Sequence, residues 1–244
     1  MFRYLHTLTL PLVALLLAGC AAAPEGEPYW DPHEAVNRKT HAFNVELDQA
    51  VFGGLGDSAG VPEPVMRVVS NFSDNLGLPG KVLNSVLQGR PEPAVQNTLR
   101  FLVNSTLGVG GLFDMAGTEF GLPEQDTDFG ETLYVWGVNE GAYMELPVIG
   151  PSTERDAFGK LVDALIDPLG FVMTPKQKTI ARVARVGKKV GDRMRFGGSV
   201  DSILHDSADS YAQSRLLYLQ NRRYSLGQSS DADAFDPYED PYGQ

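Results

Sequence analysis

The most diagnostic part of this sequence is residues 91–114, PEPAVQNTLRFLVNSTLGVGGLFD. Pro91 and Pro93 are typical of the first turn of a helix, where the missing backbone N–H has no helical partner to lose. Apolar side chains then recur at helical spacing until Gly108, which predicts the end of the helix. Residues 108–113 are apolar and rich in glycine, a composition typical of a tight turn between helices and also compatible with an interhelical hinge that needs close backbone approach.

Comparable helices, separated by Gly and Pro, are predicted on both sides of this stretch. Start signals include Asp31 before a proline and Thr153 three residues before Asp156. A break is expected at residues 75–79, which include a proline, and residues 129–147 are compatible both with a hairpin and with a helix followed by a strand. The helices expected from apolar spacing cover residues 31–52, 62–74, 82–88, 91–107, 153–165, 176–195 and 200–224.

The chain is therefore predicted to form a mostly α-helical single domain. No internal repeat is evident, and no mature segment has the run of about 18 apolar residues that a membrane-spanning helix needs. The expected division is a signal peptide at residues 1–19, a lipidated N-terminus and flexible tether at 20–29, a helical domain at 30–225, and an acidic disordered tail at 226–244.

The only cysteine, Cys20, follows Leu17-Ala18-Gly19 at the end of a leucine-rich run. That run is about ten residues long, too short to span a bilayer and typical of a cleavable export signal. Small residues before the thiol let a peptidase reach the backbone, and the thiol is then the acceptor for a thioether-linked diacylglycerol. The alternative is an ordinary secretory signal with an incidental cysteine, which would leave an unpaired thiol in an oxidising compartment. We expect cleavage before Cys20 and lipid anchoring at it.

The net charge excludes one class of partner. Loss of residues 1–19 removes Arg3 and no acid, so the mature chain has 19 basic and 31 acidic residues and a net charge of −12. Because a nucleic acid repels such a chain, nucleic-acid binding is not expected.

Residues 176–195 have the opposite charge, with Asp192 as their only acid. At about 100° per residue, their basic and apolar side chains fall on two different sides of a helix. We call the following residues the basic stripe: Lys178, Arg182, Arg185, Lys189 and Arg193. Beside a lipid anchor, such a stripe suits anionic headgroups at a membrane surface or an acidic partner. A solvated helix face over an apolar contact is an equally good interpretation.

The sequence contains no recognisable catalytic or metal-binding motif. It has no G-x-S-x-G turn, no phosphate-binding loop and no second cysteine. His33 and His41 share a helix but have no identifiable third ligand, so both are expected at the surface. The acids at residues 126–131 suit a hard cation or helix caps, and capping is the preferred interpretation. We expect no enzyme, no cofactor and no metal site.

Short blocks of residues also occur in an order that is specific to one family. The longest runs from Arg100 to Gly108 and continues at residues 111–114. The others include Asp31-Pro32, Asn37-Arg38, Phe43-Asn44, Leu47-Asp48, Val61-Pro62-Glu63-Pro64, Asn75-Leu76, Leu87-Gln88-Gly89, Asp128-Phe129-Gly130, Trp136-Gly137, Gly150-Pro151-Ser152, Arg155-Asp156, Tyr211-Ala212-Gln213 and Tyr218-Leu219-Gln220. On these blocks, nearly the whole mature domain resembles the MlaA (VacJ) lipoproteins of Gram-negative outer membranes.

The resemblance implies a ring-like domain of amphipathic helices and short extended segments with a central channel. It would lie in the periplasmic leaflet of the outer membrane, with apolar side chains facing acyl chains and a polar inner wall facing headgroups. It would remove mislocalised phospholipids from the outer leaflet and pass them toward a soluble periplasmic lipid-binding protein, beside a trimeric porin. No bond is made or broken in this role, which maintains lipid asymmetry. The alternative is a structural lipoprotein that stabilises a porin or envelope assembly without moving lipid.

The resemblance also implies where the channel or hinge residues lie, on the first helix and around residues 104–113. These residues are Phe43, Asn44, Asn104, Gly108, Gly110, Gly111 and Phe113. For Phe43, Leu107 and Phe113 taken singly, buried packing is the expectation instead of lipid contact. A buried amide needs partners or a polar cavity, so replacing Asn44 by Leu is expected to disturb function without unfolding the domain.

Overall fold

The computed structural model describes residues 24, 27, 29–53 and 62–228. The predicted signal peptide, Cys20 and residues 229–244 of the expected acidic tail lie outside the described residues.

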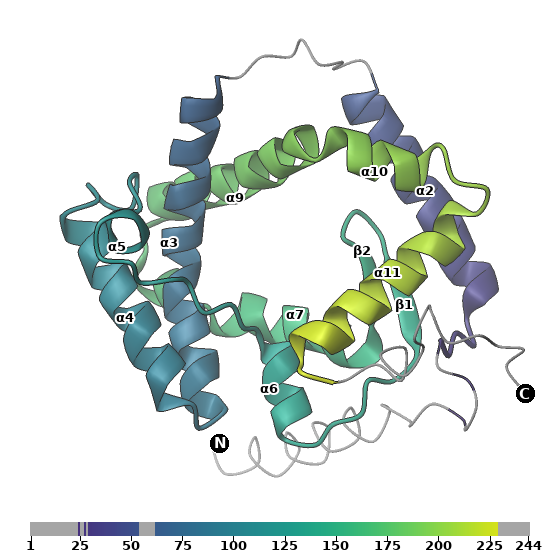
Figure 1. The fold of residues 1–244 in the computed structure, drawn as a ribbon, viewed down its shortest axis with the longest axis horizontal. Helices are drawn as coiled ribbons and strands as arrows, with labels where there is room; N and C mark the ends of the chain where they lie inside the picture. The colour runs from purple at the N-terminus through teal and green to yellow at the C-terminus, as the bar shows by residue number, and fades with distance from the viewer. Residues whose placement is uncertain (1–23, 25–26, 28, 54–61, 229–244) are drawn as a thin grey trace, which may run out of the picture.

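The α-helices are arranged around a ring (Figure 1). One side of the ring is α3 (Glu63–Leu87), with α4 (Pro91–Thr106) and the short α5 (Met115–Thr118) outside it. Along the top of the view lie α9 (Pro175–Arg195) and α10 (Gly197–Leu204), and on the side opposite α3 lie α2 (Glu34–Phe52) and α11 (Ser210–Ser225). Along the bottom lie α6 (Phe129–Val135) and α7 (Glu154–Ile166). The short α8 (Pro168–Val172) lies between α7 and α9 in the chain. No helix among the described residues is long and apolar enough to cross a membrane.

Several predicted elements are confirmed by their local hydrogen bonds. The Thr153 side chain caps α7 by accepting from the Asp156 backbone N–H, and Asp128 caps α6 by accepting from the Glu131 N–H. In α9, Thr174 forms a capping box with Gln177. These contacts span three residues, which is why they are visible in the sequence.

Residues 129–147 contain both of the elements that the sequence left open. Helix α6 is followed by strand β1 (Tyr143–Leu146), which pairs antiparallel with β2 (Gly150–Thr153). In this hairpin Tyr143 lies opposite Thr153 and Leu146 lies opposite Gly150.

The predicted break at residues 75–79 is wrong, because α3 continues through Pro79. An interior proline loses a backbone hydrogen bond and costs about 3 kcal/mol. The helix packs along both α4 and α9, and Leu76 and Leu78 beside the proline are buried. The packing of α3 against two helices, with burial of these leucines, offsets the cost of the proline.

The single helix predicted at residues 200–224 is also wrong. The chain forms α10 and α11 instead, with a turn between Leu204 and Ser210. Asp209 caps α11 by accepting from the Ala212 N–H, and it also binds Arg38 of α2. A contact with a helix that is distant in the sequence therefore selects the start of α11.

The distribution of polar and apolar side chains is reversed from that of a soluble domain. Among the described residues, buried polar and charged side chains outnumber buried apolar ones. In α2, Asn37 and His41 are buried, whereas Phe43 is 50% exposed. The prediction that His41 lies at the surface is therefore wrong, since its ring contacts the Glu145 carboxylate at 3.4 Å and the Ser210 hydroxyl at 3.0 Å.

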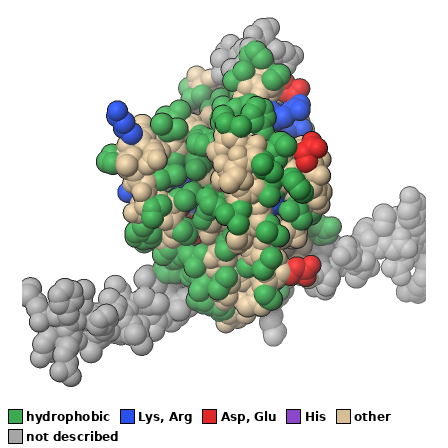
Figure 2. All heavy atoms as spheres, turned by 90° about the vertical axis from the view of Figure 1, so that its left-hand side faces the viewer, with side chains coloured by type: hydrophobic (Ala, Val, Ile, Leu, Met, Phe, Trp, Pro, Cys, Tyr) green, Lys and Arg blue, Asp and Glu red, His purple; other side chains and the backbone are tan. Residues whose placement is uncertain are grey.

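The same reversal makes the outside of α4 apolar. Asn97, Arg100 and Asn104 point inward and are buried. We call the exposed side chains on the other side of this helix and its following turn the outer apolar face: Val95, Leu99, Leu102, Leu107, Val109 and Phe113. Figure 2, which views this side of the molecule, shows a surface dominated by hydrophobic side chains.

Buried packing was expected for Phe43, Leu107 and Phe113, and that expectation is wrong. Their exposed fractions are 50%, 58% and 51%. The inward positions of α2 and α4 are taken by hydrogen-bonded polar side chains, so the apolar side chains project outward. An exposed apolar area of this extent marks a membrane or protein contact.

Candidate functional site

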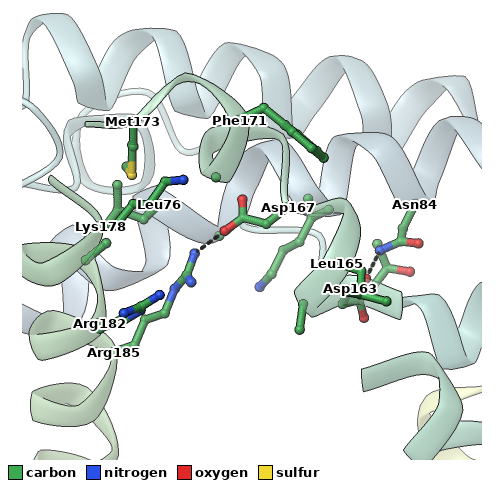
Figure 3. A pocket seen from close by; sticks show the side chains of 17 residues that line it. Leu76, Asn84, Asp163, Leu165, Asp167, Phe171, Met173, Lys178, Arg182 and Arg185 are labelled. Carbon is green, nitrogen blue, oxygen red and sulfur yellow. Dashed lines mark hydrogen bonds and ion pairs between the residues drawn. The ribbon is translucent and has the colours of Figure 1, made fainter. Parts of the chain in front are cut away.

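A cavity of about 730 Å³ lies between α3, α7, α8 and α9 (Figure 3). Helix α9 contributes Lys178, Arg182 and Arg185 to one wall. Asp163 and Asp167 come from α7 and its C-terminal end, and they line another part of the cavity. Its apolar lining includes Leu76, Leu165, Phe171 and Met173. The cavity is therefore amphipathic, and its volume is within the range of roughly 300–1,000 Å³ that is usual for small-molecule sites.

Small residues on α9 determine which of its sides faces the cavity. Ala181 and Ala184 are buried, and a Cβ added to Gly191 would lie 2.1 Å from Met66 Cε of α3. Since α9 packs against α3 through these small residues, the neighbouring positions of the basic stripe are turned toward the cavity. Close helix contact at Gly191 and the direction of Arg182 are two results of the same packing.

Two of the four cations in the lining are neutralised within the structure. Arg185 Nη2 lies 2.9 Å from Asp167 Oδ2. Lys81 pairs with Glu124 and lies 2.6 Å from Asp126 Oδ1. Lys178 and Arg182, in contrast, have no ion pair or side-chain hydrogen bond with any described residue.

Each of the two carboxylates of the lining already accepts two hydrogen bonds from the protein. Asp167 binds Arg185 and also caps α8 by accepting from the Leu169 N–H at 3.1 Å. Asp163 accepts from Asn84 Nδ2 at 2.8 Å and from the Phe129 N–H at 3.0 Å. Burial raises the pKa of Asp163.

The basic stripe does not act as one surface. Lys178, Arg182 and Arg185 line the cavity, and Lys189 is exposed outside the lining. Arg193 instead binds both carboxylate oxygens of Asp48, at 2.8 and 2.7 Å, and so joins α9 to α2.

Arg193 also occupies the one group of acids and histidine that suits a cation. Asp48, Asp201 and His205 of the described residues place one ligand atom each within 4.8 Å of one another. Arg193 pairs with both acids, and its hydrogen bonds to Asp48 lower the pKa of that carboxyl despite burial. The guanidinium already supplies the positive charge here.

The residues expected to line or gate the channel fall into two separate groups, neither of which lines the cavity. Asn44 lies beside the hairpin: its Nδ2 donates to Glu145 and to the Leu146 carbonyl, both at 3.0 Å, and its Oδ1 accepts from the Val148 N–H. Phe43 beside it points outward and is exposed.

The second group forms the turn after α4. Asn104 is buried, donates to Asp114 and accepts from the Ala116 N–H at 2.8 Å. A Cβ at Gly108 would lie 2.2 Å from the Phe113 carbonyl oxygen, and Gly110 and Gly111 have positive φ values of 72° and 92°. The glycines permit the tight turn, and a gating role for this group stays a prediction.

Comparison with known proteins identifies the family of this ring. A profile of the MlaA lipoprotein family matches residues 29–225. The chain belongs to the MlaA lipoprotein family.

Relatives with this name cover almost the whole chain. The intermembrane phospholipid transport system lipoprotein MlaA of Shigella flexneri is 32% identical over 246 residues, covering 96% of this chain and 92% of that protein. The Escherichia coli K12 protein of the same name is 31% identical with the same coverage. A solved structure described as the structural basis for maintenance of bacterial outer membrane lipid asymmetry is 32% identical, has a TM-score of 0.66, and covers 80% of this chain and 98% of its own.

Residues from the MlaA blocks close the ring in two places. At the first, Asp31 accepts from Asn37 at 2.8 Å, from Arg215 at 2.8 Å and from the Tyr211 hydroxyl, which ties the start of α2 to α11. Arg38 strengthens the same junction through Asp209 and lowers the pKa of that carboxyl to about 2.

At the second junction, Asp156 of α7 accepts from Tyr218 at 2.7 Å and from Arg222 at 2.9 and 3.0 Å. Arg222 also binds Asp128 at the start of α6 at 2.7 Å. Helix α11 of the MlaA ring thus contacts the start of α2 at one junction and α6 and α7 at the other, through buried and half-buried polar contacts.

Sequence reasoning missed the cavity walls opposite α9, which α7 and α8 contribute to the candidate site. The basic stripe predicted three cations of the site, but Asp163, Leu165 and Phe171 belong to no motif. One signal was available in the sequence: at Asp167-Pro168, an acid followed by a proline starts the short helix α8 directly after α7.

Proposed function

We propose that phospholipid passes through the polar interior of this ring, from the outer leaflet toward the periplasm, while the outer apolar face lies against acyl chains or a membrane protein. As a member of the MlaA family, the chain is an intermembrane phospholipid transport lipoprotein that maintains outer-membrane lipid asymmetry. The family is one of transport lipoproteins and not of enzymes.

The observation that carries the proposal is the reversed polarity of the ring. Apolar side chains of α2 and α4 are exposed, polar side chains of the same helices are buried against neighbouring segments, and an amphipathic cavity of about 730 Å³ lies between α3, α7, α8 and α9. A soluble structural protein gains no stability from exposed apolar side chains, whereas a ring within a bilayer leaflet places them in a matching solvent. The polar interior then offers hydrated headgroups a path past the acyl chains.

The anchor and the partners complete the proposed arrangement. Diacylation and N-acylation of Cys20 would hold the ring at the periplasmic leaflet, since stable anchoring needs more than one chain. A trimeric porin would contact part of the outer apolar face, and a soluble periplasmic lipid-binding protein would receive the lipid. Mass spectrometry of the mature N-terminus tests the anchor, because an unmodified Cys20 or cleavage elsewhere would remove this part of the proposal.

Filling the cavity tests transport directly. Gly80 lines the cavity, and an added Cβ there meets no other atom within 4 Å, so Gly80→Trp places an indole in open space. In a deletion strain, we expect wild-type protein to restore low outer-leaflet phospholipid and detergent resistance, and Gly80→Trp to fail. Lys39→Trp, at an exposed position of α2 outside the lining, is the matched control and should restore both.

The same strains separate transport from a structural role. If Gly80→Trp co-purifies with its porin and still loses lipid asymmetry, lipid movement is the function. If the folded Gly80→Trp protein restores asymmetry, the cavity is not the path and a structural lipoprotein is favoured.

A further inference from the structure

The charges in the cavity favour one class of phospholipid headgroup. Lys178 and Arg182 lie on the same wall, one helical turn apart, and neither has an anionic partner among the described residues. Figure 3 shows both beside Arg185, whose guanidinium is held by Asp167. An ammonium and a guanidinium on one wall match phosphate oxygens, which accept charge-assisted hydrogen bonds.

A headgroup ammonium, in contrast, meets two carboxylates in the lining that each already accept two hydrogen bonds from the protein. Asp167 is occupied by Arg185 and by the Leu169 N–H, and Asp163 by Asn84 and the Phe129 N–H. The ammonium of phosphatidylethanolamine would also lie near two unneutralised cations. A zwitterionic headgroup therefore gains the phosphate contact but adds like-charge repulsion.

The apolar wall distinguishes a lipid from a free phosphate. Leu165 and Phe171 line the cavity and are 67% and 77% exposed, and Met173 lines it as well. Acyl chains would cover these side chains, whereas inorganic phosphate or glycerol 3-phosphate would leave them in water.

We propose that the cavity selects phospholipids with a net negative headgroup, such as phosphatidylglycerol, by binding the phosphate with Lys178 and Arg182. The inference rests on the proposed conduit function and names the lipid class that the conduit prefers. Arg185 takes a positioning role, because its pair with Asp167 fixes the start of α8 and with it the apolar wall.

Binding of short-chain lipids to the full-length protein in non-ionic detergent tests this selectivity. The probes are dioctanoyl phosphatidylglycerol, dioctanoyl phosphatidylethanolamine and glycerol 3-phosphate, titrated by calorimetry at about 0.1 M salt, where the Debye length is about 10 Å. With each cation contributing about as much as a basic residue at an anionic surface, we expect phosphatidylglycerol to bind about 10- to 30-fold more tightly than phosphatidylethanolamine. Glycerol 3-phosphate should bind more weakly than either lipid.

The decisive variant is the double change Lys178→Gln with Arg182→Gln, which should bring the two lipid affinities within about twofold of each other. Its control is Lys39→Gln with Lys176→Gln, which removes the same charge from exposed positions outside the lining and should keep the wild-type ratio. Circular dichroism of both variants checks that they fold.

Three results would overturn the inference: equal affinities in the wild-type protein, an equal loss of selectivity in the control, or glycerol 3-phosphate binding as tightly as phosphatidylglycerol. The last result would mark a phosphate site instead of a lipid site. Failure of the conduit is separate, since it would appear as restored asymmetry with Gly80→Trp whatever the headgroup preference.

Discussion

Replacing Asp156 by Asn removes the carboxylate that α7 contributes to its junction with α11. The carboxylate is 3% exposed, accepts two hydrogen bonds from Arg222 and one from Tyr218, and among the described residues is the only carboxylate paired with the fully buried Arg155. In the variant, Arg222 still forms an ion pair with Asp128. Among the described residues, the guanidinium of Arg155 is left with only a cation–π contact to the ring of Tyr134, at 5.4 Å. The substitution therefore leaves a buried cation without an anion.

Breaking a buried ion pair on one side costs roughly 3–5 kcal/mol. A domain of this size loses about 2–4 °C of melting temperature per kcal/mol, so we expect Asp156→Asn to lower Tm by about 6–20 °C. The matched control is Glu63→Gln, the same chemical change in an exposed pair with Arg67. Exposed pairs contribute roughly 0–1 kcal/mol, so this variant should stay within about 4 °C of the wild type.

The assay is thermal unfolding of the full-length protein in detergent, followed by far-ultraviolet circular dichroism across a range of pH. Burial alone would raise the pKa of Asp156, but Arg222 outweighs it and holds the pKa below 3.8. A carboxylate with a lowered pKa stabilises the fold above its unfolded value and loses that effect as pH falls through its folded pKa. The Tm difference between wild type and Asp156→Asn should therefore be full at neutral pH and shrink below about pH 4. A Tm unchanged by the substitution at pH 7 would refute the assignment of α11 as the closure of the ring.

Four further variants probe the remaining features. Gly108→Ala should lower the free energy of unfolding by about 1–3 kcal/mol, because its Cβ would lie 2.2 Å from a backbone carbonyl oxygen. Gly80→Ala, at an open position inside α3, should instead raise the free energy of unfolding by about 0.5–1 kcal/mol and so raise Tm. The pair Leu99→Gln and Leu102→Gln, on the outer apolar face, should change stability by less than about 1 kcal/mol yet weaken flotation with vesicles; unchanged flotation would argue against lipid contact there. Asn44→Leu leaves its hairpin partners unpaired at roughly 1–3 kcal/mol each, so we expect a lower Tm; an unchanged Tm with lost transport would instead support the lining role predicted from the sequence.

Local elements were largely predictable because their signals lie within a few residues. Pro91 starts α4, Thr153 caps α7, and the capping box at Thr174 starts α9. The two wrong helix boundaries have a common cause. Burial of α3 on both sides of Pro79, and the contact of Arg38 with Asp209, depend on partners that are distant in the sequence.

The periodicity of α2 and α4 correctly divided each helix into a polar and an apolar side. It did not indicate that Asn97 and Arg100 are buried against residues 114–125 while Leu99 and Leu102 are exposed. A period of 3.6 residues is the same whether the apolar side meets a protein core or a bilayer. The direction follows from contacts between distant segments, such as those of Asn97 and Arg100 with residues 114–125 and that of Asn37 with the Tyr143 carbonyl.

The amino-acid order alone predicted the export signal with Cys20, most of the helices, the basic stripe and the MlaA resemblance, since each prediction rests on neighbouring residues or on blocks in sequence order. The three-dimensional arrangement was needed to show that Lys178 and Arg182 face a cavity without anionic partners and that Arg193 serves a different contact. The reason is physical: the charge of a side chain is a local property, but its neutralisation depends on which distant carboxylates the packed helices bring within reach.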